Sequence, residues 1–103
     1  MILLSKWRIF RVKSRLKADH NTVRAVGYSD LGDQPYISDN IKAFDSLAME
    51  ITTTEGVRIK LVGDPGSSTS VDREWGAWCR KHRVTSIADL STRYQSRKKR
   101  RAA

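Results

Sequence analysis

Cysteine and histidine are scarce in this sequence, which argues against two kinds of covalent or metal support. The chain has one cysteine among 103 residues, Cys79, so no disulfide can form within it. Its two histidines, His20 and His82, are far apart in sequence, and no group of Cys and His has the spacing of metal ligands. A lone cysteine favours a reducing, intracellular compartment, either the cytoplasm or the nucleus of a eukaryotic host.

Long hydrophobic runs are also missing. The apolar opening, residues 1–4, leads directly into Lys6, Arg8 and Arg11. These charges interrupt it well before the length of a signal-peptide core or a membrane span. We therefore expect no membrane-crossing segment.

The sequence lacks the motifs of common enzyme classes. It has no Gly-rich phosphate loop with its lysine, no Gly-x-Ser-x-Gly elbow and no His-Glu-x-x-His. Four acids around residues 30–45 do not have the spacing of a calcium-binding hand, and a solvated acidic loop is the simpler interpretation. They are Asp30, Asp33, Asp39 and Asp45. We predict a non-catalytic protein that uses no cofactor and no metal.

The charges present are mostly positive and unevenly distributed. The formal net charge is +9, and the sequence pI is about 10.2. Residues 1–24 hold seven bases and one acid, residues 25–70 hold three bases and seven acids, and residues 71–103 hold ten bases and three acids. Two basic ends therefore flank an acidic middle, and such a field attracts polyanions.

The first two thirds of the chain read as β-structure. Hydrophobic residues make up 39% of the 103 residues, enough for one folded domain. Residues 6–16 and 22–28 predict two antiparallel strands joined by a turn, although a helix is the competing interpretation of the first. Residues 29–40 predict a long loop and 41–44 a short helical turn. Residues 47–53 and 57–62 alternate as a β-hairpin does.

The last third reads as helical. Residues 63–70 have turn composition, after which helical spacing predicts a helix over 72–83 and a second helix from about 87, extending into the basic tail. We predict an α+β fold, a small antiparallel β-sheet followed by two C-terminal helices whose apolar faces cover one side of the sheet. The chain would be a single domain with a β-rich part (1–66), a helical part (67–92) and a basic tail (93–103). The covering side chains are those of Val71, Trp75, Trp78, Ile87 and Leu90.

Residues 74–90 carry a resemblance to a known family. The stretch holds Trp75, Trp78 and Cys79 on one predicted helix and Asp89-Leu90 on the next. It resembles a piece of the helical core-binding domain of phage-type tyrosine recombinases, in which a Trp-x-x-Trp-Cys-like helix leads through a short loop to an Asp-Leu helix. The resemblance implies two helices and DNA as a partner. The catalytic Arg/His/Tyr domain of that family has no counterpart here, so no functional residue is carried over.

Clustered bases give the candidate binding residues. The tail concentrates six positive charges in nine residues, 93–101, and clustered Lys and Arg neutralise phosphates with release of counterions. A solvated tail or a nuclear address is the alternative explanation. A second strip lies on the strand over residues 6–16, where its bases form the wet face if the aromatic residues are core, or join those aromatics in a base-stacking platform. The candidates are Arg80, Lys81, Arg83, Arg93, Arg97, Lys98, Lys99, Arg100 and Arg101, with Arg11, Lys13, Arg15 and Lys17.

Three functional hypotheses remain open at this stage. The first is a non-catalytic nucleic-acid-binding protein, for DNA or RNA, of phage or viral origin or within a ribonucleoprotein. The second is a protein-interaction or structural module, a homo-oligomer or a subunit of a larger assembly, in which basic ends dock onto the acidic middle of a neighbour. The third, ranked last, is a membrane-surface protein held by Ile2, Leu3, Trp7 and the nearby bases.

Overall fold

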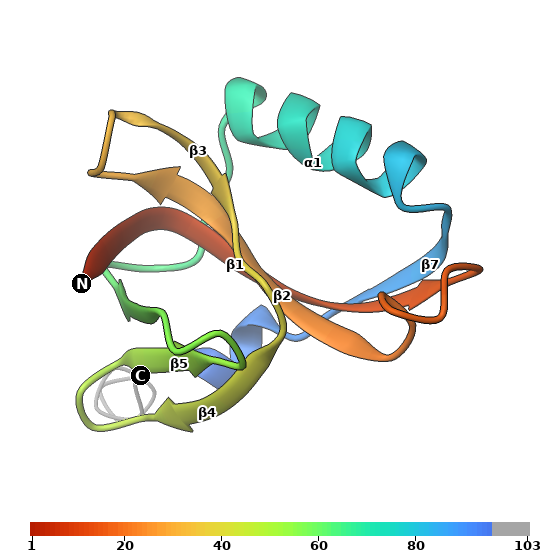
Figure 1. The fold of residues 1–103 in the computed structure, drawn as a ribbon. Helices are drawn as coiled ribbons and strands as arrows, with labels where there is room; N and C mark the ends of the chain where they lie inside the picture. Colours follow the sequence, from red (N-terminus) through yellow and green to blue (C-terminus); the bar gives the residue numbers. More distant parts are fainter. Residues whose placement is uncertain (96–103) are drawn as a thin grey trace.

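The computed structural model describes residues 1–95. Over this range a long N-terminal strand is followed by further strands, one α-helix, a last strand and a short 3-10 helix (Figure 1). In chain order the elements are β1 (Ile2–Ser14), β2 (Thr22–Ser29), β3 (Gln34–Ile37), β4 (Ile41–Asp45), β5 (Glu50–Thr53), β6 (Arg58–Leu61), α1 (Thr69–Lys81), β7 (Val84–Asp89) and η1 (Ser91–Tyr94).

Strand β1 organises the sheet because it changes partner along its length. The order is β3-β2-β1-β6-β5-β4, with β7 paired to β1 off this path. On one side β1 runs antiparallel to β2. On the other side its residues 2–4 pair in parallel with β6, and its residues 10–14 pair antiparallel with β7. The result is a mixed sheet of seven strands.

A β-bulge marks the point where β1 changes partner. The register with β2 shifts between Ser5 and Arg8, and Lys6 adopts a φ of 48°. Gly27 of β2 faces this irregularity, and a Cβ there would lie 2.8 Å from both Leu4 Cγ and the carbonyl oxygen of Ser5. The close approach of the two strands therefore requires glycine at position 27.

The sheet buries side chains on both faces, in two clusters. One face carries a cluster that includes Leu4, Trp7 and Ile9 of β1, Ile51 of β5 and Ile59 of β6. The opposite face is covered by α1 and holds the second cluster (Figure 1). Its buried members are Phe10, Val12, Val26, Val71 and Trp75. Because Ile9 and Phe10 are neighbours on a strand, they point to opposite faces.

Asn40, between β3 and β4, joins β2 to the end of β5. Its side-chain oxygen accepts a hydrogen bond from Val23 N of β2 at 2.9 Å, and its backbone oxygen accepts one from Thr54 N, just beyond β5, at 2.8 Å. The sheet therefore curls so that β4 and β5 come back towards β2, and this curl encloses the first cluster.

The predicted fold class was wrong. Residues 1–95 form a mixed sheet with a single α-helix, and strand β7 (Val84–Asp89) stands where the second helix was predicted to begin, at about residue 87. The edge of β1 beyond Phe10 offers backbone groups that β7 satisfies, and Val84, Thr85 and Ile87 are β-branched residues that suit a strand. Of the residues predicted to cover the sheet, Ile87 is 46% exposed and Leu90 packs in the cluster on the other face. The second helix implied by the recombinase resemblance is therefore a strand.

Two further predictions in the middle of the chain were wrong. The long loop predicted at 29–40 contains β3, which pairs with β2, and the helical turn predicted at 41–44 is β4. The antiparallel pair of β1 and β2 and the hairpin of β5 and β6 are confirmed. The first helix, predicted over 72–83, is confirmed and spans Thr69–Lys81, where Ser68 caps it by accepting a hydrogen bond from Val71 N.

Within residues 1–95, no helix has the length and apolarity needed to cross a membrane.

Candidate nucleic-acid interface

The second half of β1 separates apolar and basic side chains by simple alternation. Phe10 and Val12 are buried under α1, so Arg11 and Lys13 stand on the opposite face, and both are exposed. Arg11 is paired across the strands with Val23 and Ala88, and Lys13 with Ser86. No acid therefore lies directly beside either cation on the sheet.

The wet-face interpretation of β1 fits this structure, and the base-stacking platform does not. Trp7 is fully buried and Phe10 is 4% exposed. Trp7 Nε1 donates a hydrogen bond to the backbone oxygen of Gly63 at 3.1 Å, and Phe10 stacks on Trp75 with ring centroids 5.0 Å apart. Neither ring is accessible to a nucleotide base.

The row of bases continues beyond β1 to the start of β7. Arg15 N donates a hydrogen bond to the backbone oxygen of Arg83 at 3.0 Å, which sets the two residues side by side. Together with Val84 and Thr85, these two residues line an open pocket of about 400 Å³. Arg15 and Arg83 are both exposed.

Arg93, on η1, extends the row at its other end. Burial raises the pKa of Tyr94, while the positive charges of Arg11 and Arg93 act in the opposite direction. Both arginines therefore lie close enough to act on the same hydroxyl group. We define the basic strip as Arg93, Arg11, Lys13, Arg15 and Arg83.

The strip is not neutralised by carboxylates of the described residues. In residues 1–95 three arginines form salt bridges, and all three lie outside the strip: Arg8 with Asp89, Arg24 with Asp19 and Arg58 with Glu50. None of these three arginines was among the predicted binding residues. Within residues 1–95, all members of the strip are exposed and none makes a salt bridge.

The remaining predicted residues lie away from the strip or outside the described range. Lys17 is exposed in the turn after β1. Arg80 and Lys81 occupy the last turn of α1, where cations also stabilise the carbonyl end of a helix. Arg80 Nη1 lies 3.5 Å from the position of a Cβ on Gly76, so its side chain runs back along α1. The predicted contacts of Arg97, Lys98, Lys99, Arg100 and Arg101 lie outside the described residues.

A buried ionic network fixes the end of the molecule beside the strip. Asp19, in the turn between β1 and β2, receives a hydrogen bond from Arg24 Nη2 at 3.0 Å, and its other oxygen lies 2.9 Å from His82 Nδ1. His82 stacks on Trp78, with ring centroids 4.0 Å apart. Arg24 also lies over the Trp78 ring. The network joins the β1–β2 turn to the end of α1, immediately before Arg83.

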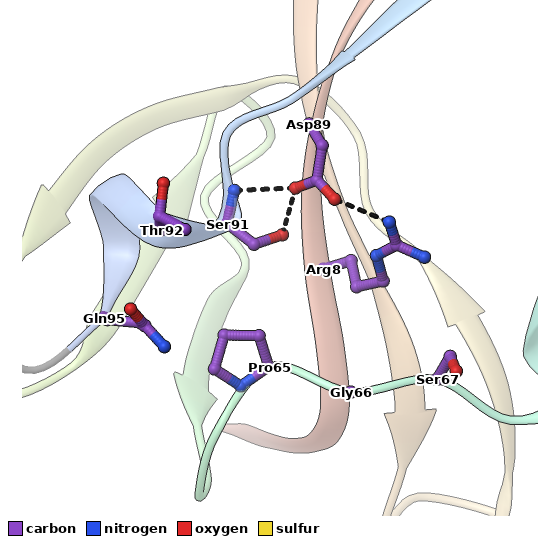
Figure 2. A pocket seen from close by; sticks show the side chains of 8 residues that line it. All are labelled: Arg8, Pro65, Gly66, Ser67, Asp89, Ser91, Thr92 and Gln95. Atoms are coloured by element: carbon purple, nitrogen blue, oxygen red, sulfur yellow. Dashed lines mark hydrogen bonds and ion pairs between the residues drawn. The ribbon is translucent and has the colours of Figure 1, made fainter.

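A second pocket, of about 500 Å³, opens between residues 65–67 and residues 89–95 (Figure 2). Its charged residues satisfy one another, since Asp89 lies between Arg8 and Ser91 and accepts hydrogen bonds from both. Burial raises the pKa of Asp89, but the hydrogen bonds from Ser91 and Arg8 and the charge of Arg8 outweigh it, so the pKa is lowered overall. Arg8 is therefore already paired with a carboxylate of the protein.

Three of the central acids accept hydrogen bonds from backbone N–H groups. Asp30 accepts a hydrogen bond from Leu3 N, Asp39 from Glu55 N and Asp45 from Leu47 N. Residues 1–95 bring together no group of three or more Cys, His, Asp or Glu that could hold a metal ion.

Sequence reasoning missed the contribution of Thr85 and Tyr94 to this surface. Thr85 lines the pocket beside the two arginines. The charges of Arg11 and Arg93 both act on the pKa of Tyr94. The start of the predicted second helix is strand β7, and no local pattern in the sequence indicates that residues 84–94 return to β1.

The chain significantly matches no protein-family model, no curated protein and no solved structure.

Proposed function

We propose that this chain is a non-catalytic nucleic-acid-binding protein that holds the phosphate backbone on its basic strip. The proposal rests on which basic side chains are paired with carboxylates and which are not. Arg8, Arg24 and Arg58 have carboxylate partners, whereas the five bases of the strip are exposed and lack such partners among the described residues. Aligned Lys and Arg side chains supply most of the sequence-independent affinity for nucleic acid.

The absence of accessible rings on β1 points to recognition through charge. Proteins that grip single strands usually offer aromatic rings on which bases stack. Here the rings of β1 are in the core, and the neighbours of Arg11 and Lys13 across the strands are Val23, Ala88 and Ser86. We therefore propose binding with little dependence on sequence. The basic tail beyond residue 95 would add phosphate contacts of the same kind.

The salt dependence of binding tests this proposal. Affinity for labelled DNA and RNA oligonucleotides, single-stranded and duplex, is measured across a series of salt concentrations. On duplex DNA the slope of log K against log salt should fall by about 1.8 in the variant Arg11→Ala/Lys13→Ala, because each lost phosphate contact removes about 0.9; on single strands, at about 0.7 per contact, it should fall by about 1.4. A salt-independent interaction would count against the proposal.

A matched control separates the strip from net charge. The variant Lys42→Ala/Arg73→Ala also removes two positive charges, from exposed positions on β4 and α1 that make no salt bridge within residues 1–95. It should leave the slope nearly unchanged. An equal fall in both variants would mean that only the total charge matters, and that the strip is not the binding surface.

A second candidate function is assembly with another copy of the chain, and the edge of β7 favours it. In the described part of the chain β7 pairs only with β1, and Ile87 at its centre is exposed. The strand contains neither Lys nor Pro, the residues that usually protect such an edge from pairing. The acidic middle is a poor docking site, because several of its carboxylates are occupied in turns. The molecular mass of the chain in solution, measured without nucleic acid, distinguishes the two functions. A dimer supports assembly, and a monomer excludes it as the primary function.

A further inference from the structure

The pocket between Arg15 and Arg83 lies on an irregularity in the pairing of β1 with β7. Lys13 is opposite Ser86, but Ser14 is opposite Val84, so Thr85 has no partner across the strands. Its hydroxyl donates a hydrogen bond to the backbone oxygen of Lys13. Bulges of this kind redirect side chains and are frequent beside binding sites.

Arg83 has an unusual backbone conformation at the same place. Its φ is 52°, in the left-handed region that long side chains rarely adopt. A glycine or asparagine would make this turn between α1 and β7 with less strain. The turn itself therefore gives no reason for an arginine at position 83, whereas a positive charge beside the pocket would.

The backbone around the pocket is held in place from several sides. Arg15 N donates to Arg83 O, and Ser14 Oγ donates to the backbone oxygens of His82 and Arg83. Leu16 N in turn donates to Ser14 Oγ. His82 is further tied to Asp19. The stems of both arginines thus start from fixed positions, which lowers the entropy lost when a ligand binds.

We infer that the pocket between Arg15 and Arg83 is an anchoring site for a single phosphate group of the bound nucleic acid, an inference that rests on the proposed function. Arginine presents a planar fork of donors that matches two phosphate oxygens at once. Arg15 and Arg83 both line the pocket and make no salt bridge within residues 1–95, whereas Arg11 and Lys13 stand on the open face of β1. The pocket fixes where one phosphate lies, and the rest of the strip follows the backbone from there.

The variant Arg83→Gly tests the anchor without endangering the fold. It removes the guanidinium group and relieves the left-handed backbone, so the melting temperature should stay the same or rise. Affinity for the oligonucleotide should nevertheless fall by about tenfold or more, the usual effect of losing a charge-assisted hydrogen bond. Arg15→Ala should lose a similar factor. Affinity equal to that of the wild type in both variants would overturn the anchor.

The conservative variant Arg83→Lys tests whether the shape of the guanidinium group matters or only its positive charge. Lysine keeps the positive charge but cannot bind two oxygens in one plane. We expect Arg83→Lys to retain the salt slope of the wild type and to bind more weakly. If it binds as well as the wild type, the pocket contributes only charge and the inference is wrong.

The failure of the anchor and the failure of the proposed function give different results. If the wild type binds oligonucleotides with a steep salt slope and Arg83→Gly behaves like Lys42→Ala/Arg73→Ala, the function stands and the anchor fails. If the wild type binds no oligonucleotide, the function fails, and pyrophosphate is titrated while the backbone amides are followed by NMR. Saturable shifts centred on Arg15 and Arg83 would still identify a phosphate site, and their absence would overturn it.

Discussion

The buried ionic network at Asp19 gives the most quantitative prediction of this structure. The side chains of Asp19 and Arg24 are only 11% and 12% exposed. The change Asp19→Ala leaves the guanidinium group of Arg24 with neutral acceptors, Thr22 Oγ1 at 3.1 Å and the backbone oxygen of Ser38 at 3.3 Å. Removing one partner of a buried pair costs about 3–5 kcal/mol. Because these acceptors remain, we expect the lower end, about 3 kcal/mol in the free energy of unfolding.

Thermal and urea unfolding measure this loss. At this chain length, a loss of about 3 kcal/mol corresponds to a fall of roughly 12–24 °C in the melting temperature. The double variant Asp19→Ala/Arg24→Leu should recover part of the loss, because no charge is then left buried without its partner. Glu74→Ala, which removes an exposed acid from α1, serves as the control. A loss below about 1 kcal/mol for Asp19→Ala, the value of an exposed pair, would refute the argument that burial makes this carboxylate necessary.

Two further predictions concern the bend in β1 and the response to acid. Gly27→Ala should lower the free energy of unfolding by about 1–3 kcal/mol in urea, because its Cβ would meet Leu4 and Ser5 at 2.8 Å, whereas Gly76→Ala on α1 should be neutral or stabilising. The lowered pKa of Asp89 means that its contribution to stability is complete above its ordinary pKa of 3.8 and is lost as the pH falls through the lower folded value. Asp89→Asn should therefore flatten the fall in melting temperature on acidification, and a pH profile identical to that of the wild type would contradict this assignment.

The elements that the sequence predicted correctly are those stabilised by contacts between near neighbours. The first two strands are joined by a short turn at residues 15–21, and β5 and β6 form a hairpin. Helix α1 has a local cap at Ser68 and apolar residues at helical spacing, among them Val71 and Trp75. In each case the hydrogen bonds join residues close in sequence, so the local pattern was sufficient.

The elements that the sequence missed depend on partners far along the chain. Residues 84–94 have helical spacing at Ile87, Leu90 and Tyr94 and a serine that resembles a helix cap, so locally a helix is the natural expectation. The pairing of Phe10 with Asp89 overrides it, and those residues are almost eighty positions apart. Strand β3 was missed because Pro35 and its polar neighbours suggest a turn, yet proline is tolerated on an edge strand.

In the candidate site, too, the local features were predicted and those that depend on distant residues were missed. The alternation of Phe10, Arg11, Val12 and Lys13 is local, and it correctly predicted the basic face of β1. The pocket at Arg83 was beyond reach, because it exists only when β7 pairs with β1 and leaves Thr85 out of register. A bulge between distant strands has no signature in either strand alone.

The positions of the acids leave the basic strip without carboxylate partners among the described residues. A chain with 20 bases and 11 acids could pair about half of its cations, and uniform pairing would leave a weak, diffuse field. In residues 1–95 several acids instead accept hydrogen bonds from backbone N–H groups, and Asp19, Glu50 and Asp89 pair with arginines outside the strip. Asp19 and Asp89 lie close to the basic strip, and each is already paired with an arginine outside it. Mutual repulsion within the strip is therefore uncompensated by these residues, and a polyanion that binds there would relieve it.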